Sequence, residues 1–210
     1  MAKIDVWPVI ESERKALAAD LRGLDTDQWS RRSLCTEWTV RDVLAHMTAT
    51  AKITPARFFT KMLSSGFSFP RLQAKDIATE KGASPADGLA RFESVLTSRN
   101  HPPGPSDTML GETIIHAEDI RRALGIRHDY PMDALVQVAD FFKGSNLIIG
   151  TKRRIEGLTL QATDTTWSHG TGPGVSGPML PLVMAMTGRP VADGELTGEG
   201  AATLRARSSS

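Results

Sequence analysis

The chain has 210 residues, of which 40% are hydrophobic and 23% charged, a composition typical of a globular protein rather than a disordered one. Its formal charge of +1, from 25 basic and 24 acidic residues, argues against the broad electrostatic bias of a protein that binds nucleic acid or an anionic membrane. Cys35 is the single cysteine, so an intrachain disulfide cannot form.

The first residues lack the apolar core of a signal peptide, and no apolar run approaches the roughly 20 residues that a membrane helix needs. The lone cysteine also suits a reducing compartment. We therefore expect a cytoplasmic protein with no nucleic-acid partner and no membrane partner.

The first two predicted helices span residues 4–24 and 39–63. Both carry apolar side chains at helical spacing on one face. Thr39 precedes the second stripe and has Asp42 three residues later, a pattern typical of a capping box. The polar segment 25–38 between the helices is expected to be a loop with at most one short turn.

A long connection and three further helices follow. Residues 64–83 mix glycine, proline and phenylalanine, which favours a lid or rim loop. Ser84 and the proline after it start a helix that ends before His101. The next helix covers 107–125, with glycine at its C-terminal end, and a fifth helix covers 131–150.

The pattern changes after residue 150. Segment 157–163 alternates in the manner of a strand and is expected to pair with 165–168. Four glycines within 170–177 indicate a loop, 178–186 is a short apolar helix, and 194–198 is predicted to be another strand. Residues 201–207 are ambiguous.

These elements predict a mainly α protein with two parts. Residues 1–150 form a helical domain. Residues 151–210 form a small α/β C-terminal region that is too short to hold a large core alone.

Three side chains suggest a metal site. Glu112 and His116 are four residues apart, which places them on the same face of a helix. His46 lies at the border of the buried face of the helix that begins after Thr39. If the two helices pack together, two imidazoles and one carboxylate converge, a set that suits a divalent cation with open coordination positions. Spacing alone leaves simpler interpretations open, namely an ordinary side-chain pair and a packed or surface histidine.

Two motifs carry a resemblance to a known family. They are Trp38-Thr-Val-Arg-Asp-Val-Leu-Ala-His46 and Gly111-Glu-Thr-Ile-Ile-His-Ala-Glu-Asp-Ile-Arg-Arg-Ala-Leu-Gly125. Together they resemble the mycothiol-dependent maleylpyruvate isomerase family, part of the wider DinB-like group of metal-binding helical bundles. The resemblance implies a DinB-like four-helix bundle within residues 1–150.

The same resemblance implies a ligand set and a co-substrate. The family's metal ligands correspond here to His46, Glu112 and His116. They would hold a divalent metal, most often Zn²⁺, and mycothiol would be the co-substrate. A metal with three protein ligands leaves room for an exogenous thiol, and coordination deprotonates that thiol near neutral pH.

The resemblance therefore implies an enzyme whose partners are a small-molecule thiol and an electrophilic substrate. The thiolate would isomerise the substrate by addition to a double bond, or be transferred to it. Water in the same position would instead make the protein a metal-dependent hydrolase, and a site without turnover would make it a binding module. The sequence also leaves a homodimer open.

Three further residues have candidate roles. Asp119 follows His116 by three residues and could orient its ring, although the pattern slightly favours a solvated acid or an ion pair with Arg122. In the family, an arginine of the C-terminal domain helps hold the substrate carboxylates, and Arg189 is the nearest candidate here. Trp38 either walls the pocket or packs ahead of the helix cap.

Overall fold

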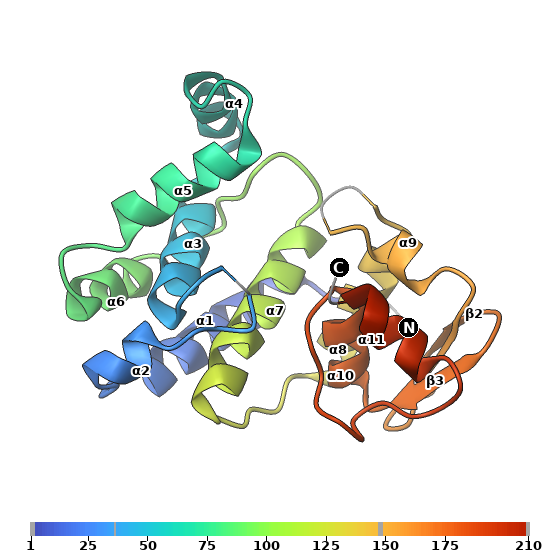
Figure 1. The fold of residues 1–210 in the computed structure, drawn as a ribbon. Coiled ribbons are helices and arrows are strands. Elements are labelled where there is room, and N and C mark those ends of the chain that lie inside the picture. Colours follow the sequence, from blue (N-terminus) through green and yellow to red (C-terminus); the bar gives the residue numbers. More distant parts are fainter. Residues whose placement is uncertain (1–2, 36, 147–148, 209–210) are drawn as a thin grey trace. The chain divides into compact units, whose positions relative to one another are not determined.

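The structure is a computed structural model that describes residues 3–35, 37–146 and 149–208, and its contacts divide the chain into two compact units (Figure 1). Asp5–His128 form the first unit. Asp129 and the residues after it, together with Ile4, form the second.

The first unit is helical. Its elements are α1 (Val6–Leu21), α2 (Thr26–Ser30), α3 (Val40–Lys52), α4 (Pro55–Ser64), α5 (Phe69–Glu80), α6 (Pro85–Glu93) and α7 (Asp107–Leu124). Helix α7 packs on α1 and α3, and α6 packs on the same two helices from the other side, which closes a four-helix bundle. The bundle core includes Leu17, Val43, Leu44, Met47, Phe92 and Ile120. The predicted mainly α fold is confirmed.

Helix α3 begins as its sequence predicts. The Thr39 hydroxyl accepts from Asp42 N, and Thr39 N donates to Asp42 Oδ2 at 3.0 Å, which completes a capping box. Lys81 Nζ lies 2.6 Å from the other Asp42 oxygen. The first turn of α3 is therefore fixed by both backbone and side-chain contacts. These contacts help to fix the position of His46 along the axis of the bundle.

Helix α7 is tied to α1 by buried charges. Arg121 is 0% exposed, and its Nε donates to Asp20 Oδ2 at 2.8 Å. Its Nη1 lies 3.6 Å from Glu13 Oε2, which also lies 2.7 Å from His128 Nε2. Because a buried arginine without carboxylates would be strongly destabilising, these pairs fix α7 against α1.

The predicted single helix over 39–63 is wrong, because the chain breaks into α3 and α4. Thr54 has φ −99° and ψ 160°, an extended conformation that a residue before proline prefers. Its side chain caps α4, and Pro55 occupies the first turn of that helix, where its missing N–H has no cost.

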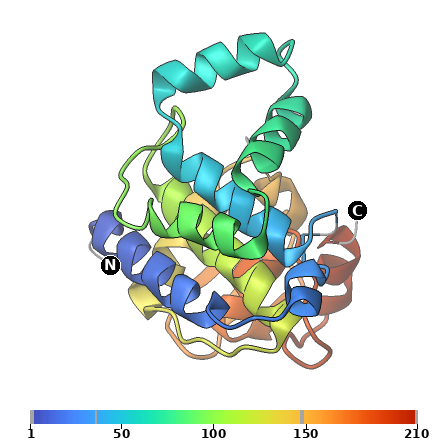
Figure 2. The same ribbon diagram turned by 90° about the vertical axis from the view of Figure 1, so that its left-hand side faces the viewer.

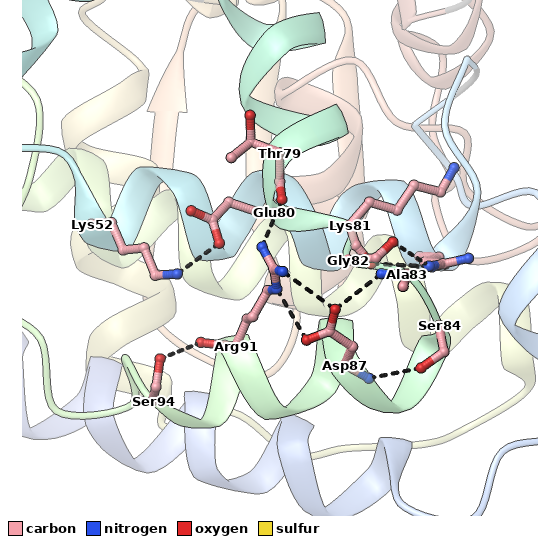
Figure 3. Close-up of polar contacts among 11 residues, drawn as sticks. Lys52, Thr79, Glu80, Lys81, Gly82, Ala83, Ser84, Asp87, Arg91 and Ser94 are labelled. Carbon is pink, nitrogen blue, oxygen red and sulfur yellow. Dashed lines mark hydrogen bonds and ion pairs between the residues drawn. The ribbon is translucent and has the colours of Figure 1, made fainter.

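The loop predicted over 64–83 is also wrong, because most of it is α5. Ser68 caps this helix, and Pro70 lies in its first turn, where proline initiates a helix rather than breaking it. Helix α5 packs on α3, and its C-terminal end is held by polar contacts to neighbouring elements (Figure 3). Lys52 Nζ contacts Glu80 at 2.6 Å, and Arg91 Nη1 donates to Thr79 O at 2.8 Å.

The second unit combines helices with a small sheet. Its elements are α8 (Met132–Phe142), α9 (Thr151–Ile155), β1 (Thr159–Ala162), β2 (Ser168–Gly170), β3 (Gly174–Gly177), α10 (Met179–Met186) and α11 (Ala201–Ser208). The strand order is β2-β1-β3, with β1 antiparallel to β2 and parallel to β3. Helix α10 is buried along almost its whole length and contacts α8, β1 and β3. The small α/β part near the C-terminus is confirmed.

Two predictions for the segments after β1 differ from the structure. Part of the predicted glycine loop 170–177 is strand β3, in which Val175 is buried opposite Leu160. Glycine is needed there because a Cβ on Gly177 would lie 2.4 Å from Glu195 O. The predicted strand 194–198 is absent from the described elements, since Thr197 makes only an isolated bridge to Ser176.

The helix predicted over 131–150 is shorter than expected. Helix α8 ends at Phe142 because Gly144 and the polar residues around it follow. Ile148, which was counted in that helix, lies outside the described residues. Because α8 packs on α10, the contacts divide the chain at Asp129, whereas the sequence analysis drew its boundary at residue 150.

Among the described residues, no helix combines the length and the apolarity that crossing a membrane requires.

The capping box of α3 can be tested through the pH dependence of stability. Although burial acts to raise the pKa of Asp42, hydrogen bonds from Lys81 and Thr39 outweigh it and hold the pKa below its ordinary value. Asp42→Ala should lower the free energy of unfolding by about 1 kcal/mol at neutral pH, as urea denaturation would measure.

The stabilisation by Asp42 is present above the unfolded-state pKa of about 4 and is lost as pH falls through the lower folded-state pKa. The difference between wild type and Asp42→Ala should therefore shrink in acid. Asp27→Ala, at an exposed position in the first turn of α2, is the matched control and should have a smaller effect. A difference that does not change with pH would contradict this role for the Asp42 charge.

Candidate metal centre

The three predicted ligands come from two helices that pack together. His46 lies in the middle of α3, and Glu112 and His116 lie one turn apart on α7. All three side chains are half-buried. One possible ligand atom from each of them lies within 4.8 Å of the others. Among the described residues, this is the only group of three or more histidine, cysteine or acidic side chains close enough to hold one metal ion.

The carboxylate of Glu112 is the most unusual group of the cluster. Both of its oxygens are buried, and neither accepts a hydrogen bond from another described residue. Burial raises the pKa of Glu112, and the positive charges of His116 and Arg14 act in the opposite direction. A buried carboxylate without donors is costly, and a cation bound between it and the two imidazoles would satisfy it. The residues present therefore fit a divalent metal.

Asp119 contacts the ring of His116. Its Oδ2 lies 2.9 Å from His116 Nδ1, and its side chain is fully buried. With a proton on Nδ1, the imidazole donates to this carboxylate and keeps its Nε2 lone pair for a cation. Arg122, the alternative partner considered for Asp119, donates to Glu118 Oε1 at 2.8 Å.

Trp38 forms one wall of the cluster. Its ring centroid lies 4.8 Å from that of His46 and 6.1 Å from that of His116. The two imidazoles lie 5.0 Å apart and cross at 80°. Trp38 also packs against the bundle core, so the two roles considered for it are combined in one side chain.

Arg14 is a neighbour of the site that the sequence analysis missed. It is 0% exposed, and its Nη1 donates to Ser98 O at 2.9 Å, while Nε and Nη2 are buried without a hydrogen-bond partner in the described structure. Its charge acts on Glu112. The signal was its position on the apolar face of α1, four residues after Ile10 and three before Leu17.

The remaining candidates lie elsewhere. Arg189 belongs to the second unit, where its Nη1 donates to Thr187 O at 3.0 Å. Cys35 lies in the loop before α3 and is not one of the clustered residues. His101 and His128 are engaged by Pro102 O and Glu13, respectively.

The N-terminal part of the chain is similar to a known family. The family model of the mycothiol maleylpyruvate isomerase N-terminal domain matches residues 10–103, a range that includes His46. A search of curated proteins gives no match.

Solved structures with a similar fold cover nearly the whole chain. One is the crystal structure of the mycothiol-dependent maleylpyruvate isomerase, with 17% sequence identity and a TM-score of 0.65. Another is a histidine-to-alanine mutant of that isomerase, with 18% identity and a TM-score of 0.66. Each match covers 96% of this chain and 94% of the other. At such low identity the likeness shows a shared fold.

The burial of Glu112 predicts a specific pH dependence for the metal-free protein. Because the folded-state pKa is raised, the stability linked to this group is present below the unfolded-state pKa and is lost as pH rises through the folded-state pKa. In chelator, Glu112→Gln should therefore gain stability relative to wild type as pH rises. The gain should be about 1.4 kcal/mol for each unit by which the pKa is raised.

Urea denaturation at several pH values, with chelator or with excess Zn²⁺, measures this effect. With excess Zn²⁺, wild type should instead be more stable than Glu112→Gln, because the variant lacks the anionic ligand. Glu37→Gln, at an exposed glutamate, is the control and should follow wild type under both conditions. If the difference between Glu112→Gln and wild type were the same at every pH, the burial of the Glu112 charge would have no energetic consequence.

Proposed function

Because residues 10–103 match the family model of the mycothiol maleylpyruvate isomerase N-terminal domain, we propose that this chain is a metal-dependent enzyme that uses a low-molecular-weight thiol of the mycothiol type. It would isomerise a small electrophilic substrate or transfer the thiol to it. The observation that carries the proposal is the convergence of His46, Glu112 and His116, with a buried carboxylate that has no hydrogen-bond donor.

The donor set favours zinc. Two neutral imidazoles and one carboxylate are common ligands of Zn²⁺ in catalytic sites, and three protein ligands leave the coordination sphere open. Glu112 contributes one negative charge, so a divalent cation in this site would keep a net positive charge. The bound metal would lower the pKa of a thiol and so supply a thiolate near neutral pH.

The chain's own residues prepare the site for that chemistry. Asp119 holds the His116 ring in one orientation and one tautomer. Trp38 covers one side of both imidazoles and limits the access of water there. Since Cys35 is not among the clustered residues, the sulfur nucleophile is expected to come from a small molecule.

A thiolate can serve either reaction. Addition to an activated double bond forms a C–S bond, permits rotation about the resulting single bond, and is reversed when the thiolate leaves. Displacement of a leaving group instead gives a stable thioether. The first reaction is the type catalysed by the structurally similar protein, a mycothiol-dependent maleylpyruvate isomerase.

Arg189 is proposed to hold a carboxylate of the substrate. Burial lowers the pKa of Arg154, and the positive charges of Arg189 and Arg153 lower it further, so these arginines lie close enough to repel one another. Such a group of like charges favours a bound anion. This supports Arg189 as an anion-binding residue of the second unit.

Metal content and thiol consumption test the proposal together. Wild type should contain about one divalent ion per chain by elemental mass spectrometry, and should catalyse isomerisation of maleylpyruvate only when mycothiol is added. Glutathione and bacillithiol serve as comparison thiols. His46→Ala should lose most of the metal and at least about a hundredfold of the turnover, because two ligands hold zinc poorly.

His101→Ala is the matched control, because it removes a histidine outside the cluster. It should keep both metal and turnover. Turnover without any thiol would favour the hydrolase, and stoichiometric metal without turnover on any thiol would favour a binding module. Wild type and His46→Ala with equally low metal content would refute the site itself.

Asp119 can be tested as a positioning residue. Asp119→Asn should weaken metal affinity by roughly 10- to 100-fold, because its amide no longer fixes the charge and tautomer of His116. Competition with a chromogenic chelator measures this affinity. Glu118→Gln, next to it on α7, is the control and should keep the affinity of wild type.

A purely structural role for Asp119 gives a different result. In that case Asp119→Asn would lower the free energy of unfolding in chelator and leave the affinity for zinc unchanged. Urea denaturation of the metal-free proteins distinguishes the two roles.

A further inference from the structure

The large apolar side chains that are exposed in the described structure all lie in one short segment. They are Phe59 (63% exposed), Leu63 (66%), Phe67 (73%) and Phe69 (44%). The segment runs from α4 through the turn into the start of α5, and α4 itself has no buried residue. Scattered exposed apolar residues are ordinary, but a group of this kind marks an interaction surface.

The hairpin that carries these side chains is firmly held at its base. Lys52 and Arg91 contact the last turn of α5, as Figure 3 shows, and Leu72 and Ile77 bury the inner face of that helix. Figures 1 and 2 show α4 and the start of α5 extending away from α1, α3, α6 and α7. The exposed rings therefore lie at the end of an anchored projection.

The turn at the end of the projection is strained. Phe67 has φ 57°, in the left-handed region that residues with a Cβ avoid. Among the described residues, every other residue with a positive φ is a glycine. The strained residue is also the most exposed of the four apolar side chains. Strained backbone of this kind clusters at functional sites.

Charge indicates what this surface meets. Residues 54–75, named here the hairpin tip, contain Arg57, Lys61, Arg71 and Lys75 and no acidic residue, although the whole chain carries only +1. Lys61 pairs with Asp76 just beyond the tip, which leaves the excess of positive charge largely in place. The whole-chain charge balance, which argued against a membrane partner, conceals this local segregation.

We propose that the hairpin tip docks on the surface of a lipid bilayer that contains anionic phospholipid. The phenylalanine and leucine side chains would enter the interfacial region, and the basic side chains would face the phosphate groups. Docking would be peripheral, since no described helix is suited to span a membrane.

The observations favour a bilayer over a second copy of the chain. A symmetric contact through the hairpin tip would bring two sets of basic residues together, which is unfavourable. A projecting tip with outward rings also suits a fluid surface, which needs no preformed groove. The inference does not depend on the metal site, because none of its residues belongs to that site.

Vesicle flotation with the full chain tests the proposal. Wild type should bind vesicles of phosphatidylcholine with about one third phosphatidylglycerol, bind phosphatidylcholine alone far more weakly, and dissociate in about 0.5 M NaCl. Arg57→Gln with Arg71→Gln should weaken binding to the anionic vesicles by at least about tenfold. Arg99→Gln with Arg127→Gln removes equal charge at exposed sites outside the hairpin tip and should bind like wild type.

The apolar contribution needs its own variant. Phe59→Ser with Phe67→Asn should also weaken binding by at least about tenfold, and asparagine tolerates the left-handed backbone of that turn. Circular dichroism should show unchanged helix content, because neither ring is buried.

Three outcomes overturn the proposal. The first is an absence of vesicle binding, and the second is equal binding to neutral and anionic vesicles. The third is a wild type that is dimeric by sedimentation equilibrium and becomes monomeric in the phenylalanine variant, which would show that a second copy covers the tip.

Discussion

The contact between α3 and α7 decides whether His46, distant in the sequence, shares one site with the neighbouring pair Glu112 and His116. Helix α7 supplies Glu112 and His116 on one face, and α3 supplies His46 from the opposite side. The cap at Thr39 fixes where α3 begins, and the buried ion pairs of Arg121 hold α7 against α1. The candidate metal centre is therefore a product of the bundle core, and a shift of one helical turn in either helix would dismantle it.

The bundle carries electrostatic features that a purely structural core would avoid. Glu112 has no hydrogen-bond donor, and Arg14 keeps two buried nitrogen atoms without an acceptor. Each charge reduces the cost of burying the other, but no hydrogen bond between them completes the pairing. Violations of polar satisfaction in a well-packed domain concentrate where function requires them. Glu112 clusters with His46 and His116, which is the physical reason to regard this part of the core as a site.

Local chemistry made much of the fold predictable. Thr39 with Asp42 fixed the start of α3, and Gly125, at φ 72°, fixed the end of α7. Helical spacing alone also predicted that Glu112 and His116 share one face of α7. Periodicity does not say which helices pack together, so the approach of His46 to this pair was predicted only from the family resemblance. Predictions failed where one residue type allows two structures. Pro55 and Pro70 began helices where a continuous helix and a loop were expected, and Gly174 and Gly177 lie in a strand.

Helix α3 contributes to the candidate metal centre and also contacts α5, whose first residues belong to the hairpin tip. It carries His46 near its middle, and Lys52 in its last turn contacts Glu80 of α5. The hairpin tip therefore extends from the same helix that supplies a ligand, although none of its residues reaches the ligand cluster. Since α5 packs along α3, a surface that held the tip would fix the orientation of α3 without altering the chemistry at Glu112.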